Sequence, residues 1–440
     1  MKKLLFLFSL LLCAALTNAQ TWVPVGNGVS TGGCVNILYV YDSVMYMGGS
    51  FNSPGNNIAQ LNDTTLSPLG LGINNRVCAI GLYKDTIYMG GYFTQAGGHS
   101  AGSIAKWNGK SFANAGFEVE GGPVSAIHQY DSLLYIGGLF TAVNNSRPSG
   151  LVSWDGKKID SVDKYGGWEG ADCFIVNNNL LLMGFGGYNY SLPVETWNNR
   201  GITYLGNDYF YLSSLTTVYL NAFCVVDTDL YLGGIFLYFE DSYAVHPIKD
   251  TVNNIAMWNG KTWSALGKGI HGTVNALVSY NSLIVAGGSF DSAGGVPVNN
   301  IAAWNGTTWS ALGNGLNGTV YTLAVYDSNL YAGGNFTSPG NGIAKFNPTL
   351  KIPPIVIIDS VNIFPNPNMG QFTVVCPPAI ITGSKPIIEV YNLLGEKVYS
   401  AGLVGGNTII SLGEQAPGIY IYRIITADGN LVNPGKLVVE

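Results

Sequence analysis

The sequence has 440 residues and a formal net charge of −6; only 10% of its residues are charged, and 59 are glycine. A mildly acidic chain without a basic run argues against nucleic acid or an anionic membrane surface as a partner. The glycine share is roughly twice the usual ~7%, and together with the few charges it favours an extracytoplasmic all-β protein.

The chain begins with the layout of a secretory signal peptide. Lys2 and Lys3 precede an apolar run over residues 4–12, and Ala19 ends a small-residue cleavage pattern. The run is too short to span a bilayer as a helix, and an ordinary buried helix is the alternative. We predict a signal peptide over residues 1–19. No later stretch has about 18 uninterrupted apolar residues, so no integral membrane segment is predicted.

Five cysteines remain after the signal peptide: Cys34, Cys78, Cys173, Cys224 and Cys376. An odd number with irregular spacing is no disulfide framework, and no CxxC pair indicates a zinc site. The sequence predicts buried thiols, or at most one or two bridges, and leaves their pairing open.

Seven repeats follow, each marked by a pair of adjacent glycines. The pairs are Gly48-Gly49, Gly90-Gly91, Gly137-Gly138, Gly186-Gly187, Gly233-Gly234, Gly287-Gly288 and Gly333-Gly334. Successive pairs lie 42 to 54 residues apart, a period that suits one four-stranded blade of a β-propeller. The count predicts a seven-bladed β-propeller over residues 20–349.

Each repeat contains four short strand patterns, such as residues 274–280 for the first and 301–306 for the third. Alternating apolar residues bounded by Asn, Asp and Gly indicate strands joined by hairpins. The second strand ends at the glycine pair, which permits a backbone conformation or a close approach that a side chain would block.

The repeat array begins and ends out of phase. Residues 21–26 have the pattern of a fourth strand without the three before it, and residues 343–347 have that of a third strand with no fourth after it. We therefore predict that the N-terminal strand completes the last blade. Closing the ring in this way removes the unpaired edges that an open array would expose.

The glycine pairs, the apolar first strand and the tryptophan of the later strands resemble kelch-type and galactose-oxidase-like propellers over residues 20–349. The arginine found between kelch blades has no regular counterpart in this sequence. The resemblance implies the architecture and carries little about function.

The repeat pattern ends at Asn347, and the sequence that follows has a different composition. Residues 350–361 have the proline content of a linker, and residues 362–440 are similar to the type A C-terminal sorting domain of the type IX secretion system of Bacteroidota. The matching residues are Pro365, Asn366, Pro367, Gly370, Gly395, Glu396, Pro417, Gly418 and Lys436. Short strands broken by turns predict a small Ig-like β-sandwich, and a generic Ig-like domain is the alternative. The resemblance implies the type IX machinery as a partner and a place outside the cell or on its outer surface.

No catalytic constellation is found in the sequence. The acidic residues Asp42, Asp85, Asp131, Asp227 and Asp327 share one turn position with Asn177 and Asn281, and such residues cap turns. The four histidines are not spaced as metal ligands, and no calcium loop, nucleophile elbow or phosphate loop occurs. The sequence therefore predicts neither a cofactor nor a metal site.

Seven positions are predicted to approach the central channel, one from each first strand. They are Asn36, Cys78, Ser125, Ala171, Asn221, Asn275 and Tyr321. None of them is a charged acid or base, whereas an enzyme of this fold needs such groups near the channel. The set favours binding over catalysis.

The repeat is most strongly broken in its fourth and fifth copies, where aromatic and acidic residues accumulate. The candidate binding residues are Trp168, Glu169, Tyr188, Tyr190, Trp197, Tyr209, Tyr211, Tyr238, Glu240, Asp241 and His246. Aromatic and carboxylate side chains on the loops of a rigid ring suit a sugar or a peptide. We predict a monomeric, non-catalytic binding propeller for a glycan or a surface protein. The alternative is a propeller enzyme, such as a glycoside hydrolase, lyase or oxidase, that acts on extracellular polysaccharide.

Overall fold

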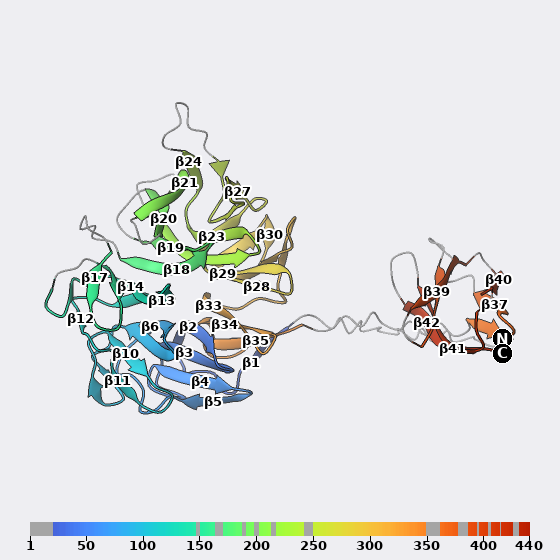
Figure 1. The fold of residues 1–440 in the computed structure, drawn as a ribbon, viewed down its shortest axis with the longest axis horizontal. Helices are drawn as coiled ribbons and strands as arrows, with labels where there is room; N and C mark the ends of the chain where they lie inside the picture. Colours follow the sequence, from blue (N-terminus) through green and yellow to red (C-terminus); the bar gives the residue numbers. More distant parts are fainter. Residues whose placement is uncertain are drawn as a thin grey trace, which may run out of the picture. The chain divides into compact units, whose positions relative to one another are not determined.

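The computed structural model describes residues 21–146, 150–162, 170–186, 191–197, 202–212, 217–241, 250–348, 361–376, 386–393, 396–403, 406–413, 415–425 and 431–440. Within these ranges the chain forms strands and turns and no helix, so none of its described segments has the form of a helical membrane span. The described residues belong to two compact units, one within Ala19–Pro348 and one within Thr349–Glu440. Figure 1 shows both units.

The described strands of the first unit include seven sheets of four or more strands. Sheet one contains β2 (Cys34–Tyr41), β3 (Val44–Ser50), β4 (Ile58–Asn62) and β5 (Thr65–Pro68). Sheet two contains β6 (Val77–Tyr83), β7 (Thr86–Gly91), β10 (Ile104–Trp107) and β11 (Phe112–Asn114). Sheet three contains β13 (Val124–Tyr130), β14 (Leu133–Gly138), β16 (Leu151–Trp154) and β17 (Ile159–Ser161). Sheet four contains β18 (Ala171–Asn177), β19 (Leu180–Phe185), β20 (Ser191–Trp197), β21 (Ile202–Tyr211), β24 (Tyr238–Asp241) and β25 (Asp250–Thr251).

The last three sheets follow the same order. Sheet five contains β22 (Tyr219–Val226), β23 (Asp229–Ile235), β26 (Ile255–Trp258) and β27 (Trp263–Ala265). Sheet six contains β28 (Ile270–Tyr280), β29 (Leu283–Ala293), β31 (Ile301–Trp304) and β32 (Trp309–Ala311), with β30 (Val296–Pro297) paired to β29. Sheet seven contains β33 (Thr319–Tyr326), β34 (Asn329–Asn335), β35 (Ile343–Asn347) and β1 (Thr21–Pro24). The described residues of the unit also form two two-stranded sheets: the hairpin of β8 (Gln95–Ala96) with β9 (His99–Ser100), and β12 (Val119–Glu120) with β15 (Ala142–Val143).

The first strands of the seven sheets, which we call the inner strands, contact one another in sequence. The contacts run from β2 to β6, β13, β18, β22, β28 and β33, and β33 also contacts β2. The sheets of this unit are therefore arranged around their inner strands, as Figure 1 shows. The protein is all-β, and this first unit is propeller-like.

Sheet seven joins the two ends of the repeat array. Strand β1 pairs antiparallel with β35, and Thr21 lies opposite Asn347. The Trp22 indole Nε1 donates a hydrogen bond to the Leu312 carbonyl at 3.0 Å, and its ring centroid lies 5.2 Å from that of Phe346. An N-terminal segment thus supplies the fourth strand of a sheet whose other three strands come from the end of the array.

In six of the sheets the two glycines of the pair allow two different approaches, as the pair of sheet five illustrates. A Cβ atom on Gly233 would overlap the Val274 side chain of the next inner strand. A Cβ atom on Gly234 would overlap the Tyr219 carbonyl oxygen of its own inner strand. The first glycine therefore lets neighbouring sheets pack closely. The second lets the second strand lie close to the inner strand of its own sheet at the β-bulge. In sheet four the equivalent positions are held by Gly184 and Phe185, two residues before the pair that the sequence indicates.

In five of the seven sheets the hairpin between the inner and second strands has positive φ at two successive turn residues. Asp42 and Ser43 have φ values of 48° and 59°, and Asn281 and Ser282 have 48° and 62°. These values are typical of type I′ turns, in which Asn and Asp are favoured. The predicted turn position is off by one residue in two repeats: the first turn residue is Lys84 in sheet two and Asn178 in sheet four. The turn of sheet two therefore begins one residue before the predicted position Asp85, and the turn of sheet four begins one residue after the predicted position Asn177.

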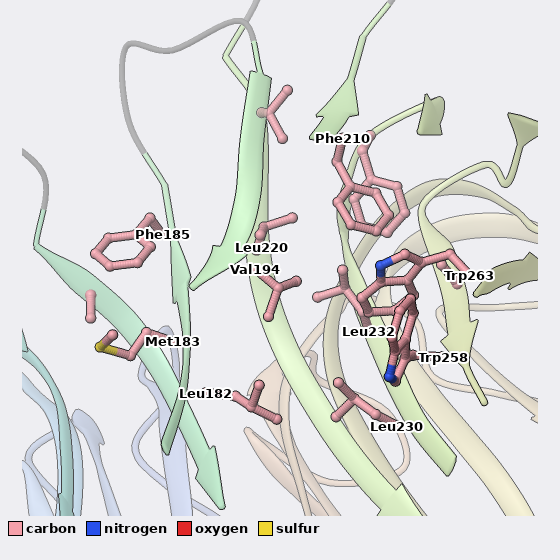
Figure 2. Close-up of a cluster of buried hydrophobic side chains, with 14 of the residues drawn as sticks. Leu182, Met183, Phe185, Val194, Phe210, Leu220, Leu230, Leu232, Trp258 and Trp263 are labelled. Carbon is pink, nitrogen blue, oxygen red and sulfur yellow. The ribbon is translucent and has the colours of Figure 1, made fainter. Parts of the chain in front are cut away.

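The core of the first unit lies between neighbouring sheets. Figure 2 shows the cluster between sheets four and five, where Phe210 lies beside Trp263. Their ring centroids are 5.1 Å apart at an interplanar angle of 84°, and Trp258 lies 5.5 Å from Trp263. Edge-to-face contacts of this kind stabilise the pair beyond the burial of its area.

The second unit has two sheets that share one core. One contains β36 (Asn362–Phe364), β37 (Gln371–Cys376) and β40 (Gly406–Ser411). The other contains β39 (Lys397–Gly402), β38 (Ile387–Tyr391), β41 (Gly418–Ile425) and β42 (Leu431–Val439). Phe372 and Ile410 from the first sheet and Ile388 and Leu437 from the second belong to the same buried cluster.

Candidate functional site

Every inner strand has a β-bulge close to its start, and the bulged residues meet in one cavity. In each sheet the pairing with the second strand shifts register by one residue at this point. The seven residues left out of the ladder are Asn36, Cys78, Ser125, Asp172, Asn221, Asn275 and Tyr321. All seven line a cavity of about 320 Å³ between the inner strands, within the usual size range of ligand pockets. We call these residues the bulge ring.

One predicted channel position is wrong, and the correction brings a carboxylate into the cavity. Asp172, and not Ala171, is the bulged residue of β18. Ala171 is fully buried and packs against Gly137 of the preceding sheet, as Val274 packs against Gly233 in a later sheet. The expectation that none of the channel positions is a charged acid therefore fails at this residue. Alanine in place of the usual valine at the packing position hid the true alignment of this strand.

Two amides of the bulge ring are oriented by hydrogen bonds to the next inner strand. Asn221 Nδ2 donates to the Val274 carbonyl at 3.0 Å, and Asn275 Nδ2 donates to the Val320 carbonyl at 3.0 Å. Asn221 Nδ2 also lies 3.5 Å from Asn275 Oδ1. An amide oxygen has two lone pairs, so Asn275 Oδ1, which accepts from Asn221 Nδ2, and Asn221 Oδ1 both keep acceptor capacity toward a ligand.

Asp172 is the carboxylate of the bulge ring. Burial raises its pKa from 3.8 to about 6, and hydrogen bonds from the Ser125 hydroxyl and the Gly186 amide oppose that rise. Gly186 is also where Tyr219 comes close, because a Cβ atom there would meet both the tyrosine ring and Asp172 Oδ2. The carboxyl group of Asp172 and the ring of Tyr219 thus meet at Gly186, and the Ser125 hydroxyl bonds to the same carboxyl group.

The stability of the protein is expected to fall as the pH rises from about 4 to about 7, because of Asp172. Its pKa of about 6 in the folded protein lies above the ordinary value of 3.8, so the folded state binds the proton more tightly than the unfolded state. The contribution is present below pH ~4 and is lost through pH ~6; a difference of about two pKa units corresponds to about 3 kcal/mol. Urea unfolding of the wild type and of Asp172→Asn at several pH values measures it. Parallel pH dependences for the two proteins would contradict this assignment.

Arg76 brings a positive charge to the edge of the cavity. Its Nε donates to Cys78 Sγ at 3.4 Å, and its guanidinium lies 5.0 Å from the centroid of the Tyr92 ring. Burial, opposed by the hydrogen bond from Arg76, raises the pKa of the Cys78 thiol. The thiol is therefore neutral at physiological pH, and the formal charges that the described residues bring to the ring are those of Asp172 and Arg76.

Several candidate binding residues predicted from the fourth and fifth repeats are described by the structure, and these lie outside the lining of the cavity. Tyr209 and Tyr211 are in β21, opposite Glu240 and Tyr238 of β24. The rings of Tyr211 and Tyr238 are stacked with centroids 5.3 Å apart at an interplanar angle of 11°. These four residues form what we call the tyrosine patch, on the outer strands of sheet four. The alternate residues Phe210 and Phe239 are buried in the core.

The other predicted binding residues divide into two groups. Trp197 ends β20, and Asp241 ends β24. The remaining five lie outside the described residues: Trp168, Glu169, Tyr188, Tyr190 and His246. No predicted binding residue that the structure describes lines the cavity. The signal that could have located the bulge ring is the residue that follows Val, Ala or Leu at the start of each inner strand.

The motifs of the C-terminal unit come together in space although they are far apart in the sequence. Asn366 Nδ2 donates to the Lys436 carbonyl at 2.8 Å, and the Val438 amide donates to Asn366 Oδ1 at 2.8 Å. Asn368 also bonds to Val438, at 3.0 Å from its Nδ2. The Pro365–Gly370 segment is therefore fixed against the last strand of the chain.

The remaining motif residues of this unit lie at turns. The Glu396 amide donates to Asn392 Oδ1 at 2.9 Å, and Asn392 Nδ2 donates to the Glu396 carboxylate at 2.8 Å. Pro417 is exposed and precedes Gly418, the first residue of β41. Gly395 lies outside the described residues.

Comparison with known proteins identifies the C-terminal unit. Residues 362–440 match the family described as the secretion system C-terminal sorting domain. This match confirms the predicted type IX sorting domain and the predicted location, which is outside the cell or at the cell surface. No curated protein has a sequence that matches this chain.

Several solved structures are similar to the chain at low identity. PorZ, a surface component of the type IX secretion system of Porphyromonas gingivalis, is 14% identical with a TM-score of 0.45; the match covers 95% of this chain and 60% of PorZ. The computationally designed protein Ika8 is 13% identical with a TM-score of 0.45, over 74% of this chain and 99% of Ika8. The WD40 domain of Neurospora crassa Pan2 is 7% identical with a TM-score of 0.47, over 75% of this chain and 97% of that domain. Likenesses of this size say nothing about ligand or activity.

Proposed function

We propose that this protein, which its type IX sorting domain directs out of the cell or to the cell surface, acts there as a non-catalytic binding protein. Its ligand, a glycan or a segment of a surface protein, occupies the cavity inside the bulge ring. The observation that carries the proposal is the convergence of one bulged side chain from each of seven inner strands on a single cavity.

The same proposal includes the architecture of the chain. Residues 1–19 are a signal peptide, residues 20–349 form a seven-bladed kelch-like propeller closed by the N-terminal strand, and residues 350–361 link it to an Ig-like sandwich at residues 362–440. The circular contacts of the inner strands and the pairing of β1 with β35 support the propeller. The shared core of two antiparallel sheets supports the sandwich. The protein is a monomer from a member of the Bacteroidota.

The chemistry of the ring favours binding. Amides, hydroxyls and backbone groups supply directed hydrogen bonds to a polar ligand, and such groups fix orientation in ligand pockets. Hydrolysis of a glycoside by the common mechanism needs two carboxyl groups on either side of the bond. Among the described residues that line the cavity, Asp172 is the only carboxylate.

A glycan and protein array probed with the mature full-length chain tests the proposal. The variant Asn36→Trp places a large ring in the cavity. We expect it to abolish binding of any array ligand that the wild type binds, because the indole ring occupies the binding site. Lys261→Trp, which adds the same ring at an exposed turn, is the matched control and is expected to keep the hit. Melting temperatures of both variants establish that the protein stays folded.

The tyrosine patch is the alternative binding site for the same proposed binding function. The double variant Tyr209→Ala and Tyr238→Ala removes it without touching the cavity. A hit that survives Asn36→Trp but is lost in this double variant would move the binding site to sheet four. A blank array would remove the support for a binding function.

The catalytic alternative has one observation in its favour, the buried carboxyl of Asp172. A carboxyl group with a pKa of about 6 is protonated often enough near neutral pH to act as a general acid. Chromatography of the array ligands after incubation with the wild type and with Asp172→Asn tests this alternative. Cleavage by the wild type that is lost in the variant would replace the binding function with an enzymatic one.

A further inference from the structure

The residues two positions before each bulge, together with the residues opposite them at the second strands, form a rim near the end where the inner strands begin. Two residues of a strand span about 6.6 Å, so the rim lies one such step beyond the bulge ring. In sheets five and seven the rim residue lies opposite the last residue of the second strand: Tyr219 opposite Ile235 and Thr319 opposite Asn335. In sheet six, whose first two strands extend further, Thr273 lies opposite Ser289. In sheet two the pair is Arg76 and Tyr92, whose amide donates to the Arg76 carbonyl at 2.9 Å.

One side of this rim is apolar and exposed. Tyr92 of sheet two is 47% exposed, Leu139 of sheet three is 52% exposed, and Tyr219 of sheet five is 37% exposed. Tyr219 also forms a bridge with Gly186 of sheet four. We call these three residues the apolar arc. Tyr219 meets Asp172 of the bulge ring at Gly186. Tyr92 lies beside Arg76, which bonds to Cys78 of the ring.

The other side of the rim is polar. Thr273 and Ser289 of sheet six, Thr319 and Asn335 of sheet seven and Ser50 of sheet one occupy the corresponding positions. A ligand that fits this rim therefore has one apolar face and several hydrogen-bonding groups. A pyranose ring has this character, because its C–H groups gather on one face and its hydroxyls point outward.

The bulge ring inside the rim is rich in hydrogen-bond acceptors. An ionised carboxylate offers about four acceptor sites, and Ser125 and Gly186 each donate to Asp172. The Nδ2 groups of Asn221 and Asn275 donate to backbone carbonyls. Asn275 Oδ1 accepts one bond from Asn221 Nδ2 and has a second lone pair for the ligand, as Asn221 Oδ1 also has. Such a ring selects a ligand that donates hydrogen bonds, as sugar hydroxyls do.

The two formal charges at the site oppose each other. Asp172 repels an acidic sugar at neutral pH while Arg76 attracts it, and the reverse holds for an ammonium group. The two charges therefore give the site no net preference for an anionic or a cationic sugar. A neutral ligand meets neither repulsion.

From these observations we infer that the cavity binds the end of a neutral glycan. The terminal sugar ring stacks on Tyr219 in the apolar arc, and its hydroxyls donate to Asp172 and to the amide oxygens of the bulge ring. This inference rests on the proposed binding function and names its ligand class and seat.

Calorimetric titration of the mature full-length chain with lactose, cellobiose and mannobiose tests the inference. At least one of the three is expected to bind. Tyr219→Leu is expected to weaken that binding by about tenfold through loss of stacking, whereas Tyr219→Phe stays within about twofold. Asp172→Asn is expected to weaken it by about tenfold through loss of charge-assisted hydrogen bonds. Tyr204→Leu, at an exposed tyrosine of β21, is the matched control and is expected to bind as the wild type does.

Three results would overturn the inference. Digalacturonic acid or a glucosamine dimer binding more tightly than the neutral sugars would contradict the charge argument. Unchanged affinity in both Tyr219→Leu and Asp172→Asn would contradict the proposed binding site at Tyr219 and Asp172. Failure of all three neutral sugars, together with a protein hit on the array that Asn36→Trp abolishes, would overturn the glycan while the proposed binding function stands.

Discussion

Deletion of residues 20–28 is expected to lower the melting temperature of the protein by roughly 10 °C or more. The deletion removes β1, leaves the edge of β35 unpaired and takes Trp22 out of the core. Loss of a buried tryptophan side chain alone costs about 3–5 kcal/mol. An exposed strand edge also promotes association between chains, so soluble aggregates are expected at the same time.

The substitution Trp22→Ala separates the packing from the strand pairing. It keeps the backbone of β1 but removes the hydrogen bond to Leu312 and the contact with Phe346. Val23→Ala in the same strand is the control, and its effect is expected to be about 1 kcal/mol because Val23 is only half-buried. Thermal unfolding followed by circular dichroism measures all three proteins. A deletion variant that melts with the wild type would contradict closure of the ring by the N-terminal strand.

Deletion of residues 362–440 is expected to leave the protein in the periplasm. These residues are the type IX sorting domain, and the first unit has its own core clusters, so we expect it to fold without them. Fractionation of the native host followed by immunoblotting measures the distribution among periplasm, outer surface and medium. The expected change is from mostly surface or medium for the full chain to essentially none for the truncated chain. Normal export of the truncated chain would contradict the role of the domain.

A point variant distinguishes loss of the signal from loss of the fold. Asn366→Ala removes the bonds to Lys436 and Val438, each of which contributes about 1 kcal/mol. If the variant is exported normally, the Pro365–Gly370 segment serves the fold of the domain. If it remains in the periplasm with an unchanged melting temperature, Asn366 takes part in recognition by the export machinery.

The location of the binding residues shows where sequence reasoning succeeds and where it stops. The glycine pairs predict which strands lie second in six of the seven sheets, because a side chain there would overlap the next inner strand or a carbonyl of its own inner strand. In sheet four Gly184 and Phe185 hold these positions, and the predicted pair lies two residues later. The same reasoning misplaces the bulge in β18, because Ala171 takes a position that Val holds in most other sheets. A shift of one residue in a strand reverses which side chains face each way. The predicted channel set therefore lacks the carboxylate of Asp172.

The tyrosine patch illustrates the opposite case. Its aromatic residues are conspicuous in the sequence. Because side chains alternate along β21, Tyr209 and Tyr211 lie on one face of the sheet and Phe210 lies on the other. The sequence contains this alternation but does not say how far β21 lies from the inner strand. That distance follows from the strand order of sheet four, in which β21 is the fourth strand and β24 the fifth.

Features that repeat, or that match a family motif, follow from the amino-acid sequence alone: the all-β class, the repeating strands and the sorting domain at residues 362–440. Local alternation, turn chemistry and close packing at glycine act over a few residues, so they can be read from neighbouring letters. The packing of whole sheets is needed to bring Asp172 and its six counterparts into one cavity and to place Tyr219 beside Asp172 at Gly186. The bulged residues are 42 to 54 positions apart from one repeat to the next. Their meeting depends on seven bulges and on contacts between distant strands, which no short stretch of sequence specifies.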